Sequence, residues 1–171
     1  GYDSRYFAEF NFGYNGSERF SKSQRWGFFP SAGAAWVISN EPFFKPLHKT
    51  FSNLKLRYSY GIVGNDEIGG RFNYISRVDM TESTRKGYFG EMRGVQYNGI
   101  EIDSYANEDI TWEKSYKHNG ALELGLFKKL DIIAEYWSEH RKDIYMTRAD
   151  IPNTMGLQAS VSANVGEALA R

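Results

Sequence analysis

The chain has 171 residues, no cysteine, and 21 acidic against 21 basic residues; this excludes a disulfide scaffold, a Cys-ligated metal site and a thiol nucleophile, and gives no basic footprint for nucleic acid. Aromatic residues make up 16% of the chain, yet the mean hydropathy of -0.57 is too polar for a helical membrane protein, and no apolar run approaches the roughly 18 residues of a membrane helix. Transmembrane barrels combine these two features, because lipid-facing side chains alternate with a polar interior and polar loops.

The first half of the chain alternates apolar and polar residues with a period of two, which predicts β-strands over 5–14, 25–38 and 53–64. The third segment has the clearest alternation. Its residues of one parity are Leu54, Leu56, Tyr58, Tyr60 and Ile62, set against Lys55, Arg57, Ser59 and Gly61.

The second half continues the pattern after a long interruption. It predicts a strand over 110–126, a tight connection through 127–129, another strand from Leu130 onward, and a last strand beginning near Ser160. The chain is therefore predicted to contain five to six strands in succession.

The length of the alternations separates a membrane barrel from a soluble fold. Soluble strands average about 5–6 residues, whereas a membrane strand needs about 9–11 residues at a tilt near 45°, and these alternations persist for about ten or more. Aromatic residues near the predicted strand ends suit interfacial girdles; they are Trp26, Trp36, Tyr58, Tyr60 and Trp112. The alternative, a soluble carbohydrate-binding β-sandwich, would need alternations about half as long, with turn signals every ~8–12 residues.

The predicted connections are unequal in length. They are 16–24, 39–52, 65–109, 127–129 and 147–159. Because barrels have short periplasmic turns and longer extracellular loops, the first, third and fifth are expected outside the cell, and the other two on the periplasmic side. Residues 41–45 could form one helical turn within the 39–52 connection.

Several blocks of the sequence resemble SusC/RagA-type TonB-dependent transporters, in the order in which that family has them. They include Asn15-Gly16-Ser17-Glu18-Arg19-Phe20, Arg25-Trp26-Gly27-Phe28-Phe29-Pro30-Ser31, Leu54-Lys55-Leu56-Arg57-Tyr58-Ser59-Tyr60-Gly61, Thr111-Trp112-Glu113-Lys114 and Asn164-Val165-Gly166-Glu167. The resemblance implies an all-β, antiparallel transmembrane β-barrel segment: residues 1–171 form about five to six strands of a roughly 22-stranded barrel. The plug and the remaining strands are expected outside this chain. The ending Ala168-Leu169-Ala170-Arg171 departs from the family pattern, as expected for a fragment that stops inside a strand.

The resemblance also implies a function. It implies import of a nutrient across a bacterial outer membrane together with a SusD-like surface lipoprotein, driven by TonB through the absent N-terminal region. Outer-membrane lipid would surround the barrel, and the ligand would be an oligosaccharide or, as the alternative, an oligopeptide. We expect no enzymatic activity, no cofactor and no nucleic-acid partner. Lys55, Arg57, Glu123 and Glu135 are expected to line the lumen.

Aromatic residues of the long loop are candidate ligand contacts, because rings stack on sugar faces or bury peptide side chains, and loops carry function on rigid scaffolds. They are Tyr74, Tyr88, Phe89, Tyr97 and Tyr105. The competing interpretation is that these rings form the core of a loop that packs on itself.

Other polar residues suggest no committed site. The loop acids Asp66, Glu67, Asp103, Glu108 and Asp109 could in principle form a carboxylate pair or a calcium site, but loop acids are usually solvated. His48, His118 and His140 lie on separate predicted elements without metal-ligand spacing. We therefore predict neither a catalytic residue nor a metal site.

Overall fold

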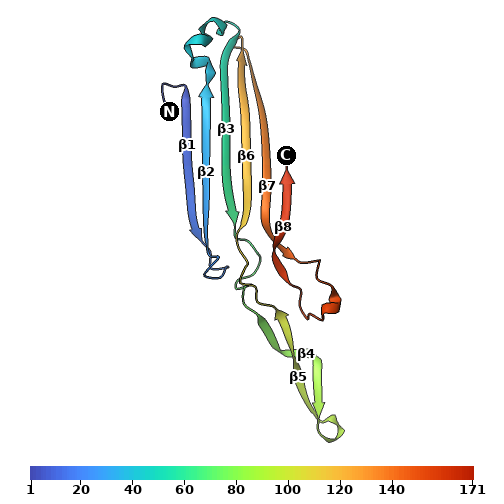
Figure 1. Ribbon diagram of the computed structural model, residues 1–171. Helices are drawn as coiled ribbons and strands as arrows, with labels where there is room; N and C mark the ends of the chain where they lie inside the picture. Colours follow the sequence, from blue (N-terminus) through green and yellow to red (C-terminus); the bar gives the residue numbers. More distant parts are fainter.

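The computed structural model describes residues 1–171, apart from the side chains of Glu82, Ser83 and Asn153. Six strands form one antiparallel sheet in the order β1-β2-β3-β6-β7-β8 (Figure 1). They are β1 (Tyr6–Gly16), β2 (Trp26–Val37), β3 (Phe51–Asn65), β6 (Glu113–Leu126), β7 (Leu130–Thr147) and β8 (Ser162–Ala170). A separate hairpin of β4 (Arg77–Phe89) and β5 (Val95–Ser104) is inserted between β3 and β6. The predicted all-β antiparallel fold is confirmed.

Short 3-10 helices occupy some of the connections. They are η1 (Ile38–Asn40), η2 (Pro42–Leu47), η3 (Glu91–Arg93) and η4 (Asn153–Met155). Among the residues that the structure describes, no helix has the length and apolar character needed to cross a membrane.

The predicted strand boundaries hold to within a few residues, with two exceptions. The start predicted at Ile110 is wrong, because Ile110 and Trp112 are buried below the loops and β6 begins only at Glu113. The β4–β5 hairpin lies inside the predicted loop 65–109 and was not predicted, since adjacent apolar residues such as Tyr88 and Phe89 break the two-residue period there.

One parity of residues stays on one face of the sheet across the strand pairs. Trp36 opposes Leu56, Leu56 opposes Leu122, and Leu122 opposes Ala134. Large apolar side chains on this face are exposed, with Phe10 and Phe12 at 65% and 67%. A continuous apolar surface of this kind marks contact with something other than water. We call it the apolar face.

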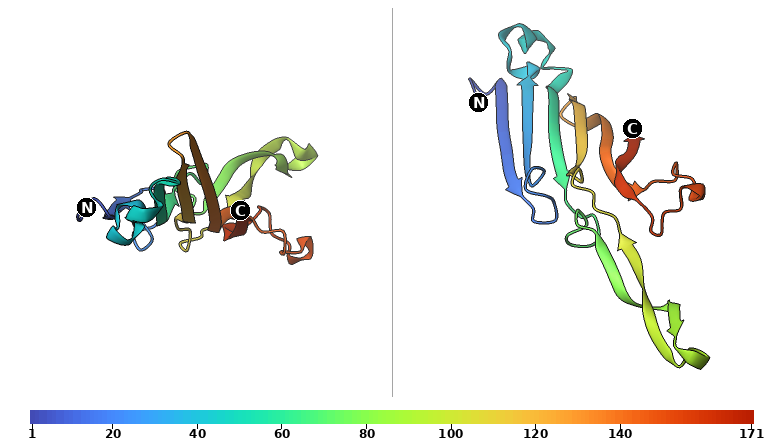
Figure 2. Two further views of the ribbon diagram at one scale, coloured as in Figure 1. Left: turned by 90° about the horizontal axis from the view of Figure 1, so that it is seen from above. Right: turned by 60° about the horizontal axis from the view of Figure 1, so that its bottom comes forward.

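The opposite parity forms a polar face, which carries Glu9, Asn11, Lys55, Arg57, Ser59, Ser115, Lys117, Asn119, Glu123, Glu135 and Glu139. Figure 2 shows the sheet as one layer, with the β4–β5 hairpin extending beyond its end. The six strands form a single sheet, which differs from the two packed sheets of a β-sandwich. The strands of the sheet, at 9 to 18 residues, also exceed the length expected for a sandwich.

The connections sort to two ends of the sheet, as predicted (Figure 1). Residues 17–25, the β4–β5 hairpin and residues 148–161 lie at one end, which we call the long-loop end. At the short-turn end, β6 and β7 are joined by 127–129, where Phe127 and Lys128 have φ of 54° and 56°. Two successive residues with positive φ are the geometry of a tight hairpin turn whose twist matches the strands.

The helical turn predicted within 39–52 is confirmed as η2, and Glu41 precedes it as its N-cap residue. The Glu41 carboxylate is buried and accepts hydrogen bonds from Tyr6 Oη at 2.5 Å and Trp36 Nε1 at 3.1 Å. Arg5 Nη1 lies 3.3 Å from the other carboxylate oxygen. These donors, the Tyr6 hydroxyl first, lower the pKa of Glu41 from its usual value of 4.5.

The pKa of Glu41 predicts how acid affects the short-turn end. Since this pKa is lower in the folded than in the unfolded protein, the stabilisation from the ionised carboxylate is present above about pH 4.5 and is lost as the pH falls through the folded value. We expect Glu41→Gln to destabilise the full-length protein at neutral pH and to reduce the further loss below pH 4.5. Urea unfolding midpoints measured at neutral pH and below pH 4.5 test this. Glu18→Gln, at an exposed position, is the control; equal pH profiles for wild type and Glu41→Gln would contradict the prediction.

The aromatic residues predicted near strand ends divide into two groups. Trp26 and Trp36 do lie near the two ends of β2, on the apolar face. Each stacks on a tyrosine of β1: Trp26 on Tyr14 at 5.0 Å and Trp36 on Tyr6 at 6.3 Å between ring centroids. The prediction is wrong for Tyr58 and Tyr60, which lie in the middle of β3, and for Trp112, which is buried outside the strands.

The core of the molecule lies under the loops at the long-loop end. We call it the loop-base cluster; it contains Phe20, Ile68, Ile110 and Trp112, with Phe29 and Tyr145 packed against it. Phe20 and Ile110 are 0% and 1% exposed. The expectation that the loop aromatics form the core of the long loop is wrong for Tyr88, Phe89 and Tyr97, which are exposed.

Candidate functional site

The polar face carries a network of charges on β3, β6 and β7. Glu123 Oε1 lies 3.5 Å from Lys55 Nζ and 3.2 Å from Arg57 Nε. The Arg57 N–H at Nε is not directed at that oxygen, so the contact is an ion pair rather than a hydrogen bond. Arg57 Nη2 also lies 3.9 Å from Glu135, which accepts a hydrogen bond of 2.5 Å from Asn119. The structure thus brings together the four residues predicted to line the lumen.

A second polar group lies further along β6 and β7, toward the long-loop end. Glu139 Oε1 accepts hydrogen bonds from Ser115 Oγ and from Arg141 Nε, both at 2.7 Å, and lies 4.0 Å from Lys117 Nζ. Alternating positive and negative side chains therefore run along the polar face. Such a surface can exchange hydrogen bonds with a polar solute without presenting one dominant charge.

At the long-loop end, polar contacts tie the first connection to the residues that follow β3. Ser17 Oγ donates a hydrogen bond of 2.7 Å to Asp66, and Arg19 Nη1 lies 2.6 Å from Glu67. The hydrogen bond from Arg19 lowers the pKa of Glu67. Gly69 has a φ of 89°, which glycine adopts without strain and which permits the turn after the strand.

Among the loop acids, Asp66, Glu67 and Asp103 have side-chain partners, the last of them Arg77 at 3.2 Å across the base of the hairpin. At Glu108 it is the backbone carbonyl that accepts a hydrogen bond, of 2.9 Å from Ser21 Oγ. Within the described residues, we find no group of three or more histidine or acidic side chains arranged to hold a metal ion.

The five candidate aromatic residues fall into two places. Tyr88, Phe89 and Tyr97 lie on the distal part of the β4–β5 hairpin, where Phe89 and Tyr97 meet edge to face at 5.7 Å. Their exposures are 52%, 61% and 60%. Tyr74 and Tyr105 lie at the base of the hairpin and are half-buried. The structure therefore brings Phe89 and Tyr97 together on one face of the hairpin. Tyr88, which pairs with Gln96, lies on the other face, and Tyr74 and Tyr105 lie apart from all three.

Contacts at the base attach the hairpin to the loop between β7 and β8. The Ile102 N–H donates to Gln158 Oε1 at 2.9 Å, and the Gln158 N–H donates to Tyr105 Oη at 3.1 Å. Asn107 Nδ2 donates to the Ser162 carbonyl at 3.0 Å. The Tyr105 hydroxyl thus serves a loop contact, while the distal rings have exposed surface.

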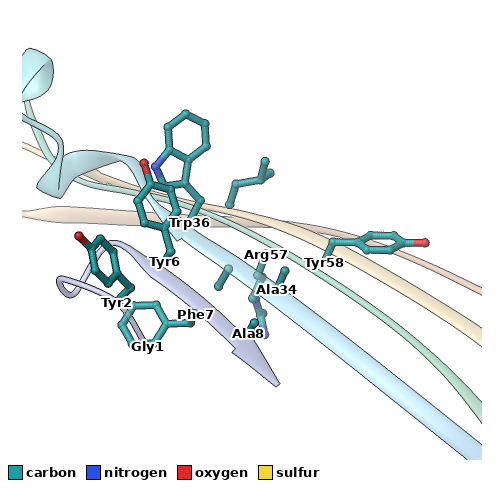
Figure 3. Close-up of a pocket in the computed structure, with 11 residues that line it drawn as sticks. Gly1, Tyr2, Tyr6, Phe7, Ala8, Ala34, Trp36, Arg57 and Tyr58 are labelled. Atoms are coloured by element: carbon teal, nitrogen blue, oxygen red, sulfur yellow. The ribbon is translucent and has the colours of Figure 1, made fainter. Parts of the chain in front are cut away.

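A recess of about 560 Å³ lies at the short-turn end of β1, β2 and β3. Figure 3 shows Tyr6 and Trp36 close together there, with the small residues Ala8 and Ala34 between them and Tyr58. Side chains from both faces line it, including Phe7 and Arg57 of the polar face. It lacks a convergent set of polar groups, which distinguishes it from a site for a polar solute.

Sequence reasoning missed the positions of two histidines. His118 on β6 and His140 on β7 both lie on the apolar face, where the register places Tyr116 opposite His140 and His118 opposite Ser138. Both histidines line one recess. Their spacing in the sequence does not indicate that they are neighbours, because only the strand register brings them together.

Comparison with known proteins gives a consistent result over almost the whole chain. No protein-family model matches it. The chain is 32% identical to the TonB-dependent receptor SusC of Bacteroides thetaiotaomicron over 164 residues, which cover 95% of this chain and 16% of that protein. It is 33% identical to the TonB-dependent receptor P39 of Formosa agariphila over 167 residues, which cover 96% of this chain and 15% of that protein.

Solved structures agree with the sequence relatives. The RagAB peptide importer matches in its closed-closed and its open-open state, each with a TM-score of 0.74 and 27% identity, over 98% of this chain and 17% of the solved chain. The present chain therefore spans less than a fifth of the length of these relatives.

Proposed function

Because this chain belongs to the SusC/RagA family of TonB-dependent transporters, we propose that it forms part of the barrel wall of a bacterial outer-membrane nutrient importer. The observation that supports this best is the register that separates an exposed apolar face from a polar face across β1, β2, β3, β6 and β7. In a barrel wall the apolar face contacts lipid and the polar face lines the lumen. The plug and the other strands of the barrel belong to the rest of the protein.

The proposed mechanism is transport without covalent chemistry. Ligand is captured at the outer rim with a SusD-like lipoprotein and passes along the lumen when TonB, acting through the N-terminal region, moves the plug. Lys55, Arg57, Glu123 and Glu135 line the path and exchange hydrogen bonds with a polar solute. Because these charges are already paired with each other, no single ion pair holds the ligand in the lumen.

The proposed ligand contacts are the aromatic rings of the loops, Tyr74, Tyr88, Phe89, Tyr97 and Tyr105. The three distal rings on the hairpin have exposed faces suited to stacking on sugars, so an oligosaccharide is the first candidate. An oligopeptide is the second candidate, because the similar solved structures described above are of a peptide importer.

The hairpin itself supports a role in binding. A two-stranded hairpin is marginally stable in water, and this one exposes Met80, Tyr88, Phe89, Tyr97 and Ile100. Burial of these side chains against ligand or lipoprotein offsets the cost of keeping them in water.

We expect the triple substitution of Tyr88, Phe89 and Tyr97 by serine to weaken ligand binding by at least about tenfold, since exposed aromatic anchors carry much of a binding energy. Full-length transporter purified with its co-purifying proteins is titrated with oligosaccharides and with oligopeptides. Phe43→Ser, at an exposed aromatic residue of the opposite end, is the matched control.

The readouts distinguish the alternatives. Unchanged affinity for every ligand would contradict the assignment of these rings to the ligand site. Loss of the lipoprotein with unchanged ligand affinity would instead assign them to the partner interface. Recovery of the wild-type protein as a soluble monomer without detergent would overturn the importer proposal itself.

A further inference from the structure

The apolar face becomes basic toward the long-loop end of β6 and β7. Starting from the short turn, opposed pairs on this face are Leu126–Leu130, Leu124–Ile132, Leu122–Ala134, Gly120–Tyr136, His118–Ser138, Tyr116–His140 and Lys114–Lys142. Charge at hydrocarbon depth is costly, and lysine side chains near the end of a span reach toward the interface. If the apolar face contacts lipid, Lys114 and Lys142 therefore lie at the level of the lipid headgroups.

A recess of about 520 Å³ opens at this place. Tyr60, Tyr116, His118, His140 and Lys142 line it. The Tyr60 and His118 rings are 4.8 Å apart between centroids. The recess thus combines aromatic walls, which can contact a sugar, with nitrogen donors, which can contact an anion.

The two lysines are incompletely neutralised. They are directly opposed across β6 and β7, and like charges in that arrangement repel each other. Lys114 Nζ lies 3.8 Å from Asp143, and Lys142 Nζ lies 3.9 Å from Glu167, which also contacts His140 Nε2. Both lysine pairs are long and exposed, and such pairs contribute little. An anion bound between the lysines would relieve their repulsion.

We propose that this recess binds the phosphate of lipid A, the phosphorylated glycolipid of the outer leaflet. The inference rests on the proposed function, because it requires the apolar face to lie in an outer membrane. Lys114 and Lys142 contact the phosphate oxygens, the rings of Tyr60 and Tyr116 pack against the sugar, and Leu122 and Tyr136 contact the acyl chains. Charge complementarity selects this lipid over an uncharged one.

Titration of the full-length transporter tests the proposal, after extraction in detergent and removal of lipid. The probes are monophosphorylated lipid A, the same lipid without phosphate, and inorganic phosphate as competitor. We expect Lys142→Gln to weaken binding of the phosphorylated lipid about fivefold, because a basic residue near a membrane surface contributes about 1 kcal/mol. Glu167→Gln should strengthen it, since it removes the competing carboxylate. Lys128→Gln, in the short turn, should leave it unchanged.

Opposite effects of the two variants exclude general destabilisation as the cause. Equal affinity of wild type and Lys142→Gln, or equal affinity for the two lipids, would overturn the proposal. Competition by inorganic phosphate at the same concentration as lipid A would assign the recess to free anions and would overturn the proposal that it binds a lipid. Each variant is first shown to require detergent for extraction from outer membranes. Extraction without detergent would overturn the importer proposal, whereas a failure of the lipid titration alone would overturn only the lipid proposal.

Discussion

Replacement of Phe10 by arginine should destabilise the full-length protein in the membrane. Phe10 lies on the apolar face of β1, midway in sequence between Tyr6 and Tyr14, whose rings stack on the two tryptophans of β2. It therefore occupies the middle of the proposed lipid-facing band. An arginine at that depth costs about 2–4 kcal/mol. We expect the free energy of unfolding in lipid vesicles to fall by about this amount.

The adjacent residue supplies a matched control. Asn11 lies on the polar face and donates a hydrogen bond of 2.7 Å to Glu9. Asn11→Arg places the same side chain one position along the same strand, next to a carboxylate, so its effect should be within about 1 kcal/mol. Equal losses for Phe10→Arg and Asn11→Arg would show that the two faces of β1 do not meet different environments.

Truncation of Trp112 should destabilise the long-loop end more than any substitution of an exposed aromatic residue. Trp112 is 7% exposed and packs against Phe20 and Phe29 at 5.3 and 5.1 Å between ring centroids. Its Nε1–H donates to the Arg25 carbonyl at 3.1 Å. Removal of a buried tryptophan costs about 3–5 kcal/mol through lost burial and the cavity left behind. Trp112→Ala should therefore lower the free energy of unfolding by about this amount.

Proteolysis gives this prediction a local readout. The loop-base cluster holds together the segments around Phe20, Ile68 and Ile110. Trp112→Ala should therefore expose all three of these segments to cleavage together. Trp137→Ala, at a residue 47% exposed on the polar face, is the control and should change neither measurement appreciably. Trp112→Phe keeps a smaller aromatic ring and should have an intermediate effect, of which the lost hydrogen bond accounts for about 1 kcal/mol. Cleavage confined to one of these segments would contradict a shared core.

Local alternation was sufficient to predict most of the sheet. Each strand of the sheet carries its own two-residue period, as in Leu54 to Ile62, and the turn at 127–129 is short enough to fix which strands are neighbours. The placement of successive connections at alternate ends of the sheet then follows from an up-and-down order of strands. The family resemblance rested on these same segments, and the sequence relatives confirm it.

Features that depend on contacts between distant residues could not be predicted. Trp112 looked like an interfacial ring because its neighbours alternate, but burial against Phe20 places it in the loop-base cluster. His118 and His140 become neighbours only through the register of β6 and β7. Glu41 accepts hydrogen bonds from Tyr6 and Trp36, which lie on different strands. In each case the partner is set by tertiary structure, which periodicity does not encode.

The alternation of the two faces affects how the sequence of such a wall can evolve. Neighbouring residues of one strand contact different environments, so a substitution on the polar face can alter which solute passes while the adjacent lipid contact is preserved. A single-residue insertion within β3 or β6 would instead exchange the two faces along the rest of that strand. Connections tolerate changes in length more readily than strands do, and the inserted β4–β5 hairpin lies in a connection.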